Sequence, residues 1–289
     1  TSLGRALHAH PNVFDSIFVT MDEAGETSGT LSLVLIRLAD LKEAQLRLRN
    51  KVVGGMTYPV LMMGVACVLL VVIFAFVIPK LTQVFESMNK PLPLMTKFLI
   101  FVSGTLTDWW FVFAGLGFFS VWLFRRWIRS EKGIPKWDRI KLRAPLFGTL
   151  IRMIAITRFS TTMATLLGSG VPILTAMNIS KNLVGNSLIA NAIEEARSNI
   201  TEGQSIAEPL KRSGEFPPLV IHMIAIGEKT GELPDMLKNI SSTYEEQVTA
   251  RIDGMTALLE PIMIIGMGGV VGFIVMSIFI PLLEVSNIN

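Results

Sequence analysis

The sequence has little charge and few of the residues that build catalytic or metal sites. Only 17% of its 289 residues are charged, it has three histidines and one cysteine, and its formal net charge is +3. A single cysteine, Cys67, excludes an intrachain disulfide, and its place in an apolar run is typical of a small buried residue. The small net charge gives no support for nucleic-acid binding. Hydrophobic residues make up 51% of the chain, which indicates an integral membrane protein.

The common signatures of enzyme active sites are missing as well. His8, His10 and His222 do not have a spacing typical of metal ligands. The segment 227–231 (Gly-Glu-Lys-Thr-Gly) superficially resembles a phosphate-binding loop, but no glycine precedes its lysine and no strand precedes the segment. No serine or cysteine lies in a Gly-x-Ser-x-Gly nucleophile elbow. We therefore expect no catalytic residue, no metal and no cofactor.

Three apolar stretches are long enough to cross a bilayer, whose core of about 30 Å needs about 20 helical residues. They lie at about 58–78, within 98–124 and at about 261–280, and we expect Pro79 and Pro281 to end the first and third. None has a charged residue at its centre, which argues against an ion or proton path.

Clusters of basic residues predict the orientation of these spans. Four precede the first span, and eight follow the second: Lys42, Arg47, Arg49 and Lys51, then Arg125, Arg126, Arg129, Lys132, Lys136, Arg139, Lys141 and Arg143. Cytoplasmic loops of bacterial membrane proteins carry an excess of lysine and arginine. The first and third spans therefore leave the cytoplasm, and the second returns to it.

The third span and the polar segment before it repeat the first, at an offset of 202 positions. The matching pairs run from Phe14 and Phe216 through Glu43 and Glu245 and Pro59 and Pro261 to Leu81 and Leu283. Two parallel copies need one returning span between them, which agrees with the orientation from charge. The second copy is preceded by 155–204, for which the first has no counterpart, so we expect the chain to be part of a longer one.

The polar segments have helical periodicity throughout and no alternating, valine-rich stretches typical of strands. Six helices are predicted in the second copy, at about 157–167, 172–184, 187–200, 206–212, 218–226 and from 233 onward. In the first copy no strong helix breaker lies between Leu31 and Gly54-Gly55. A helix from Leu31 to Ile78 would be about 70 Å long, with Gly54-Gly55 and Pro59 as the places to bend.

Each copy contains the turn Gly-Glu-x-x-Gly-x-Leu just before its long helix. The six residues concerned are Gly25, Glu26, Gly29, Gly227, Glu228 and Gly231. One interpretation is structural: glycine adopts backbone angles that other residues avoid, and the glutamate accepts amide hydrogen bonds at the start of the next helix. The other is contact with a partner protein or a cation. Both remain open at this point.

Five residues in the membrane segments are candidates for interaction. Pro59, Glu260 and Pro261 mark the membrane edge, where Glu260 either is solvated or contacts an amino group or backbone of a small membrane partner. Gly268 and Gly272 stand four residues apart, a spacing that lets helix backbones approach closely. We expect them to serve packing within the chain or self-association.

The predicted fold is all-α: an integral membrane protein with three transmembrane helices and helical-bundle cytoplasmic domains, arranged as a tandem parallel repeat. The expected boundaries are a first cytoplasmic domain at 1–54 (N-terminally incomplete), transmembrane helix 1 at 55–80, a periplasmic loop at 81–97, the transmembrane helix 2 region at 98–127, a second cytoplasmic domain at 128–254, transmembrane helix 3 at 255–282 and a periplasmic tail at 283–289.

Several motifs together resemble one known family. They are the segment 51–79, with Tyr58-Pro59 within it and Val77-Ile78-Pro79 at its end, the segment 167–173 (Leu-Gly-Ser-Gly-Val-Pro-Ile) and the two Gly-Glu turns. Along essentially its whole length the chain resembles the inner-membrane platform proteins of type II secretion systems and type IV pili, although Gly55 departs from the residue types expected there. The closing segment 268–271 is more similar to the secretion branch.

The resemblance implies a bacterial inner-membrane protein without enzymatic activity, whose two larger domains are cytoplasmic. It also implies the partners: a hexameric cytoplasmic ATPase, pilin-like or pseudopilin subunits, and other inner-membrane components of the machine. We expect homo-oligomers, since three helices make a thin membrane domain. The alternative functions are a small permease or channel subunit, which would need polar groups deep in the spans, and a membrane enzyme, which would need a convergent acid, base or metal set.

Overall fold

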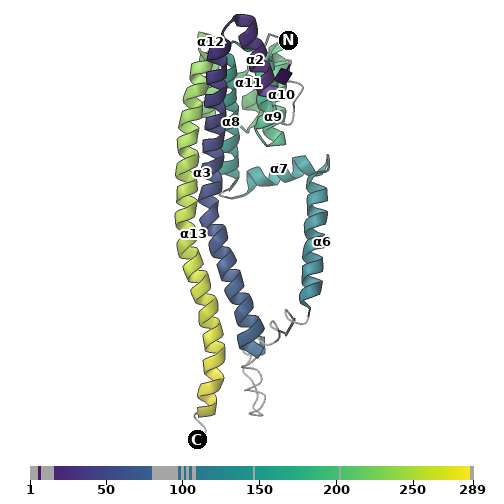
Figure 1. Ribbon diagram of the computed structural model, residues 1–289, viewed down its shortest axis with the longest axis vertical. Helices are drawn as coiled ribbons and strands as arrows, with labels where there is room; N and C mark the ends of the chain where they lie inside the picture. Colours follow the sequence, from purple (N-terminus) through teal and green to yellow (C-terminus); the bar gives the residue numbers. More distant parts are fainter. Residues whose placement is uncertain are drawn as a thin grey trace. The chain divides into compact units, whose positions relative to one another are not determined.

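The computed structural model describes residues 6–7, 16–79, 97–98, 101, 104–105, 109–145, 147–201 and 203–286, and all regular structure in these ranges is helical (Figure 1). The elements are α2 (Ser16–Ser28), α3 (Leu31–Val72), a π-helical turn η1 (Ile73–Val77), α6 (Trp110–Ile128), α7 (Gly133–Arg143), α8 (Phe147–Gly168), α9 (Ile173–Leu183), α10 (Ser187–Thr201), α11 (Ala207–Ser213), α12 (Pro218–Thr230) and α13 (Leu233–Ser286). The predicted all-α fold is confirmed for this part of the chain. The predicted periplasmic loop at 81–97 lies almost entirely outside it.

The chain divides into two compact units. Unit 1 comprises Thr1–Val52 and Ile128–Ile252, and unit 2 comprises Val53–Trp127 and Asp253–Asn289. The two long helices, α3 and α13, each contribute their first part to unit 1 and their second part to unit 2.

Unit 1 is a helical bundle with one apolar core. Helix α8 supplies its largest fully buried side chain, Phe159, whose ring meets that of Phe216 edge to face at 5.6 Å between centroids. Met21 of α2 and Leu38 of α3 are buried in the same core as Met177 of α9. The N-terminal helices therefore complete the bundle that the later segment forms.

All six helices predicted in the second copy are present, and two of their boundaries differ by more than one residue. Helix α8 begins at Phe147, ten residues before the predicted start, and α12 continues to Thr230. The early part of α8 contains Gly148, which weakens a sequence-based assignment. A Cβ at Gly148 would collide with the carbonyl of Leu142, so glycine permits the close approach of α7 and α8.

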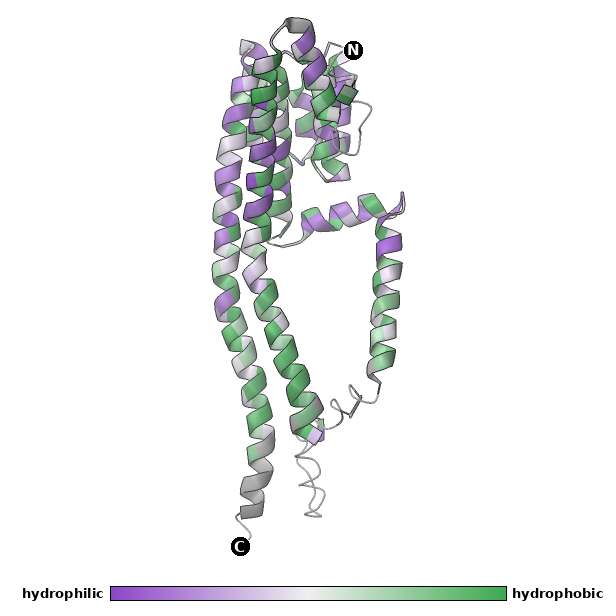
Figure 2. Cartoon of the chain, in the orientation of Figure 1, coloured by the Kyte–Doolittle hydropathy of each residue, from purple (hydrophilic) through white to green (hydrophobic). Residues whose placement is uncertain are grey.

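Unit 2 exposes apolar side chains that would ordinarily be buried. Val60, Leu61, Ile264 and Ile265 are each more than 60% exposed, and apolar residues predominate along the second parts of α3 and α13 in Figure 2. Surfaces of this kind belong in lipid or against other apolar helices.

Four described helices are long and apolar enough to cross a membrane: Leu31–Val72, Phe111–Ile128, Phe147–Gly168 and Leu233–Ser277. They differ in burial. Half of the most apolar window of Phe147–Gly168 is buried, against 6%, 0% and 6% of the windows in the other three. Helix α8 is apolar because it occupies the core of unit 1, and a helix with apolar residues on most sides is expected there.

Pro281 departs from the expected helix end, whereas Pro59 lies in a helix that was expected to continue through it. Pro281 does not end the third apolar helix, because α13 continues through it to Ser286. Pro59 and the glycines before it also lie within the continuous helix α3. Proline at 59 removes the backbone N–H that would bond the carbonyl of Gly55, and the Thr256 hydroxyl of α13 donates to that carbonyl instead, at 3.3 Å. The lost bond is thereby replaced.

Candidate functional site

The second Gly-Glu turn joins α12 to α13 in unit 1. Gly231 caps α12 with φ of +78°, a left-handed conformation that glycine adopts without a steric penalty. Gly227, one turn earlier, is buried where α13 begins: a Cβ there would lie 2.9 Å from the Cα of Leu233. The two glycines therefore have separate tasks, one reversing the chain and the other letting the helices touch.

The first Gly-Glu turn, between α2 and α3, has the same construction. Gly29 has φ of +72°, and a Cβ at Gly25 would lie 3.1 Å from the Cα of Leu31 and from the Cβ of Val34. The N–H of Thr30 donates to the carbonyl of Gly25 at 2.9 Å, which closes the helix end in the manner of a Schellman motif.

Glu228 stabilises the start of α11. It does not contact the start of α13, the helix that follows its turn. Its carboxylate accepts a hydrogen bond from the N–H of Ile206 at 2.8 Å and one from the Ser205 hydroxyl at 2.7 Å. These groups lie at the N-terminus of α11, whose free N–H groups favour a negative charge. The sequence had suggested α13 as the recipient. The carboxylate thus connects α12 to the short helix α11.

Asp22 in α2 is a buried carboxyl group that the sequence analysis did not single out. Its side chain is fully buried, and neither oxygen has a hydrogen-bond partner among the described residues. Burial raises the pKa of Asp22, and the negative charge of Glu26 raises it further. The offset of 202 places Ile224 at the matching position of α12. A position-by-position comparison of the two copies would therefore have singled out Asp22 as a carboxyl group where the other copy has an apolar residue.

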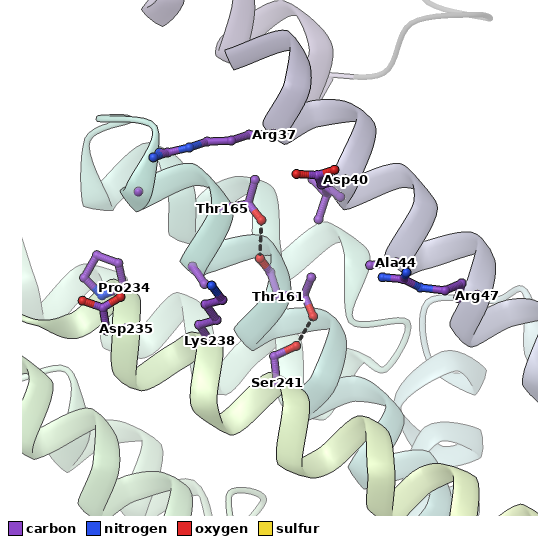
Figure 3. A pocket seen from close by; sticks show the side chains of 13 residues that line it. Arg37, Asp40, Ala44, Arg47, Thr161, Thr165, Pro234, Asp235, Lys238 and Ser241 are labelled. Carbon is purple, nitrogen blue, oxygen red and sulfur yellow. Dashed lines mark hydrogen bonds between the residues drawn. The ribbon is translucent and has the colours of Figure 1, made fainter. Parts of the chain in front are cut away.

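A polar groove of about 430 Å³ lies between α3, α8 and α13 in unit 1 (Figure 3). Thr161, Thr165 and Ser241 line it: the Thr161 and Ser241 hydroxyls share a hydrogen bond, and that of Thr165 donates to the Thr161 carbonyl at 2.9 Å. Charged side chains of both signs surround these hydroxyls, namely Arg37, Asp40 and Arg47 of α3 and Asp235 and Lys238 of α13. The groove suits a polar protein segment better than a small apolar ligand.

The basic helix α7 is fixed to the bundle by Asp138. Its buried carboxylate accepts the N–H of Ser187, at the start of α10, at 2.7 Å and pairs with Lys141 at 2.5 Å. Burial tends to raise the pKa of Asp138, but these hydrogen bonds outweigh it and the pKa is lowered. The cationic side chains of α7 are therefore presented from a rigid support.

The membrane-edge candidates come together in unit 2. Tyr58, Pro59 and Glu260 line one apolar groove of about 370 Å³ between α3 and α13, whereas Pro261 does not line it. Gly268 and Gly272 have open space where a Cβ would stand. Among the described residues, close packing within the chain, one of the two roles expected for these glycines, is therefore not seen at either position.

The chain matches a family model and several characterised proteins. The model for the type II secretion system (T2SS) protein F matches residues 1–79 and 159–281. The chain is 35% identical over 282 residues to the type IV pilus assembly protein PilC of Myxococcus xanthus (98% of this chain, 68% of that protein). It is 36% identical over 286 residues to the type II secretion system protein F of Aeromonas hydrophila (99% and 74%). The chain belongs to the type II secretion system protein F family.

Membership in the protein F family confirms the resemblance seen in the sequence. Proteins of this family are non-catalytic assembly-platform components of secretion and pilus machines, so the chain is not an enzyme. Its apolar helices agree with the inner-membrane location of such components. The relatives include both secretion and pilus proteins at similar identity, and the branch is therefore left open.

Proposed function

We propose that this protein F family member is the inner-membrane assembly platform of its machine, which couples a cytoplasmic ATPase to the extraction and polymerisation of pilin-like subunits. The observation that carries the proposal is that α3 and α13 each run from the bundle of unit 1 into the apolar unit 2 as one helix. A continuous helix has a hydrogen bond at nearly every residue and transmits displacement along its axis. Work done on unit 1 would then reach the membrane.

Contacts between α3 and α13 support the tandem parallel arrangement. In unit 1 the ammonium of Lys51 donates to the Thr249 hydroxyl at 3.1 Å and lies 3.8 Å from the carboxylate of Glu245. In unit 2 the Thr256 hydroxyl meets the carbonyl of Gly55. The paired positions differ by nearly the repeat offset, as expected of parallel helices in equal register. The helices would then act as a pair.

Burial supports three membrane spans rather than four. The parts of α3 and α13 in unit 2, together with α6, expose their apolar surface, whereas α8 is half buried in unit 1. On this proposal 1–54 and 128–254 are cytoplasmic, and 81–97 and 283–289 are periplasmic. The uncovered Gly268 and Gly272 are then available for contact between copies of the platform.

Breaking the continuous helices tests the proposal. A four-residue Gly-Ser insertion between Val52 and Val53 of α3, or between Ile252 and Asp253 of α13, should abolish secretion or pilus assembly while the chain still inserts and still binds the ATPase. The control is the same insertion at the exposed turn Gly203-Gln204 in unit 1. Full assembly with both long helices interrupted would contradict the proposal.

Association with the ATPase needs its own measurement. A photo-reactive residue at Lys238, which lines the polar groove, should cross-link the ATPase in cells, whereas one at its exposed neighbour Asn239, outside the groove, should do so less. Absence of any ATPase from cross-links and from the purified platform would remove the coupling role.

A further inference from the structure

The groove of unit 2 is apolar except for one carboxylate. Between α3 and α13 it is lined by aliphatic side chains and by the methionines Met62, Met263 and Met267, with Tyr58 and Glu260 as its polar members. Methionine is flexible and polarisable, and surfaces rich in it adapt to apolar partners of varied shape. Such a lining is suited to holding a helix that must later be released.

Glu260 has no hydrogen bond or ion pair with any of the described residues. Glu260 is exposed beside an apolar surface at the expected membrane edge, and acidic residues in such places commonly mark a functional contact. At the matching position the first copy has Tyr58, which lines the same groove. The groove therefore has a single negative charge.

We propose that this groove binds the apolar membrane helix of a pilin-like subunit, with Glu260 paired to a positively charged group at the cytoplasmic end of that helix. The proposal rests on the platform function and names the substrate contact within it. The charge of the occupant follows from a general rule, because inner-membrane helices carry lysine and arginine at their cytoplasmic ends. A membrane helix also matches the groove in being apolar along its length.

Residue-specific cross-linking in cells tests the proposal. A photo-reactive residue at Met62 or Met263, inside the groove, should capture the pilin-like subunit. The matched controls are Leu61 and Ile262, which lie on the same two helices, are more than 60% exposed and do not line the groove. We expect at least a several-fold difference between groove and control positions.

Substitution of Glu260 tests the role of its charge. Glu260→Gln keeps the shape and should lower subunit capture at Met263 by about ten-fold, the usual order for losing a charge-assisted hydrogen bond. Glu260→Lys should lower it further, and changing the subunit's cytoplasmic basic residue to glutamate should restore capture to the lysine variant. Immunoblots of membrane fractions establish that each variant is present at normal level.

Capture of phospholipid alone in the groove, equal capture at the control positions, or unchanged capture in both Glu260 variants would overturn the groove assignment. If subunits then cross-link elsewhere on unit 2, the platform function survives without this site. If no position of the wild-type chain captures a subunit, and cells lacking the chain still assemble fibres, the proposed function itself fails.

Discussion

The two Gly-Glu turns share their backbone geometry but differ in what is buried beside them. In both, one glycine adopts a left-handed conformation, at φ of +72° and +78°, and another allows close contact with the next helix. Three residues before the contact glycine, α2 buries Asp22 whereas α12 buries Ile224. Glycines therefore set the path of the chain in each turn, and the core accepts either an apolar or a carboxyl side chain beside it.

This difference has an energetic consequence. A fully buried carboxyl without hydrogen-bond partners costs free energy, and the raised pKa of Asp22 expresses that cost. Ile224 at the matching position is 1% exposed and contributes to the core. We therefore expect the second turn to be the more stable. Equivalent substitutions at the two turns should change the free energy of unfolding by different amounts or in opposite directions.

The largest effect on stability is expected when Ile224, buried beside the second turn, is changed to the aspartate that is buried beside the first. Ile224→Asp removes a buried apolar side chain and inserts an unpaired carboxyl, which should lower the free energy of unfolding by about 3–5 kcal/mol. Thermal unfolding of the detergent-purified chain, followed by circular dichroism, measures the loss. Ile226→Asp on the same helix is the control, since Ile226 is 40% exposed and should change stability little. Equal losses would show that burial at 224 is unimportant.

Adding a methyl group to the contact glycines comes next. Gly227→Ala places a Cβ 2.9 Å from a backbone atom of α13 and should cost about 1–3 kcal/mol of unfolding free energy. Gly25→Ala should cost less, because its nearest atoms are at 3.1 Å. The same unfolding measurement serves for both. In contrast, Gly254→Ala in open space within α13 should stabilise the chain slightly through helix propensity. A larger loss of unfolding free energy for Gly25→Ala than for Gly227→Ala would contradict the expectation that the closer contact costs more.

The position of both turns was predictable from the sequence, whereas their contacts were not. Glycine at fixed spacing before an amphipathic run predicts a helix end, and Gly29 and Gly231 lie at such ends. The partner of Glu228 was not predictable, because α11 becomes its neighbour only through packing of the bundle. For the same reason the polar groove in Figure 3 has no local signal: its charges come from α3 and α13, which are distant in sequence.

The predicted helix end at Pro281 was wrong, and the continuity of α3 through Pro59, although predicted, involves a tertiary contact. A proline in a helix interior ordinarily breaks it, yet α3 passes Pro59 because Thr256 satisfies the carbonyl that proline leaves free. Hydropathy alone similarly marks α8 as a possible membrane span, although half of its apolar window is buried in unit 1.

Asp22 should make stability depend on pH in a way that its asparagine variant does not. The pKa of Asp22 in the folded chain lies above its ordinary value of 3.8, so the folded state holds its proton more tightly than the unfolded state. The free energy of unfolding should therefore fall as pH rises from below 3.8 through the folded pKa. Asp22→Asn should be close to wild type at acid pH and about 1 kcal/mol more stable at neutral pH.

Unfolding temperatures of wild type and Asp22→Asn at pH 3.5 and pH 7.5 check this expectation. Glu23→Gln is a matched control, since Glu23 is the exposed neighbour of Asp22 on the same helix. A variant whose advantage is the same at both pH values would mean that ionisation of Asp22 has no part in the difference.

The smallest expected effects come from the two glutamates of the turns. Glu228→Gln leaves an oxygen for the N–H of Ile206 but removes the charge at the start of α11, which should cost about 0.5–1 kcal/mol. Glu26→Gln should cost less, because removing that charge also relieves its repulsion with ionised Asp22. A greater loss for Glu26→Gln at neutral pH would mean that Glu26 supports its turn more strongly than it opposes Asp22.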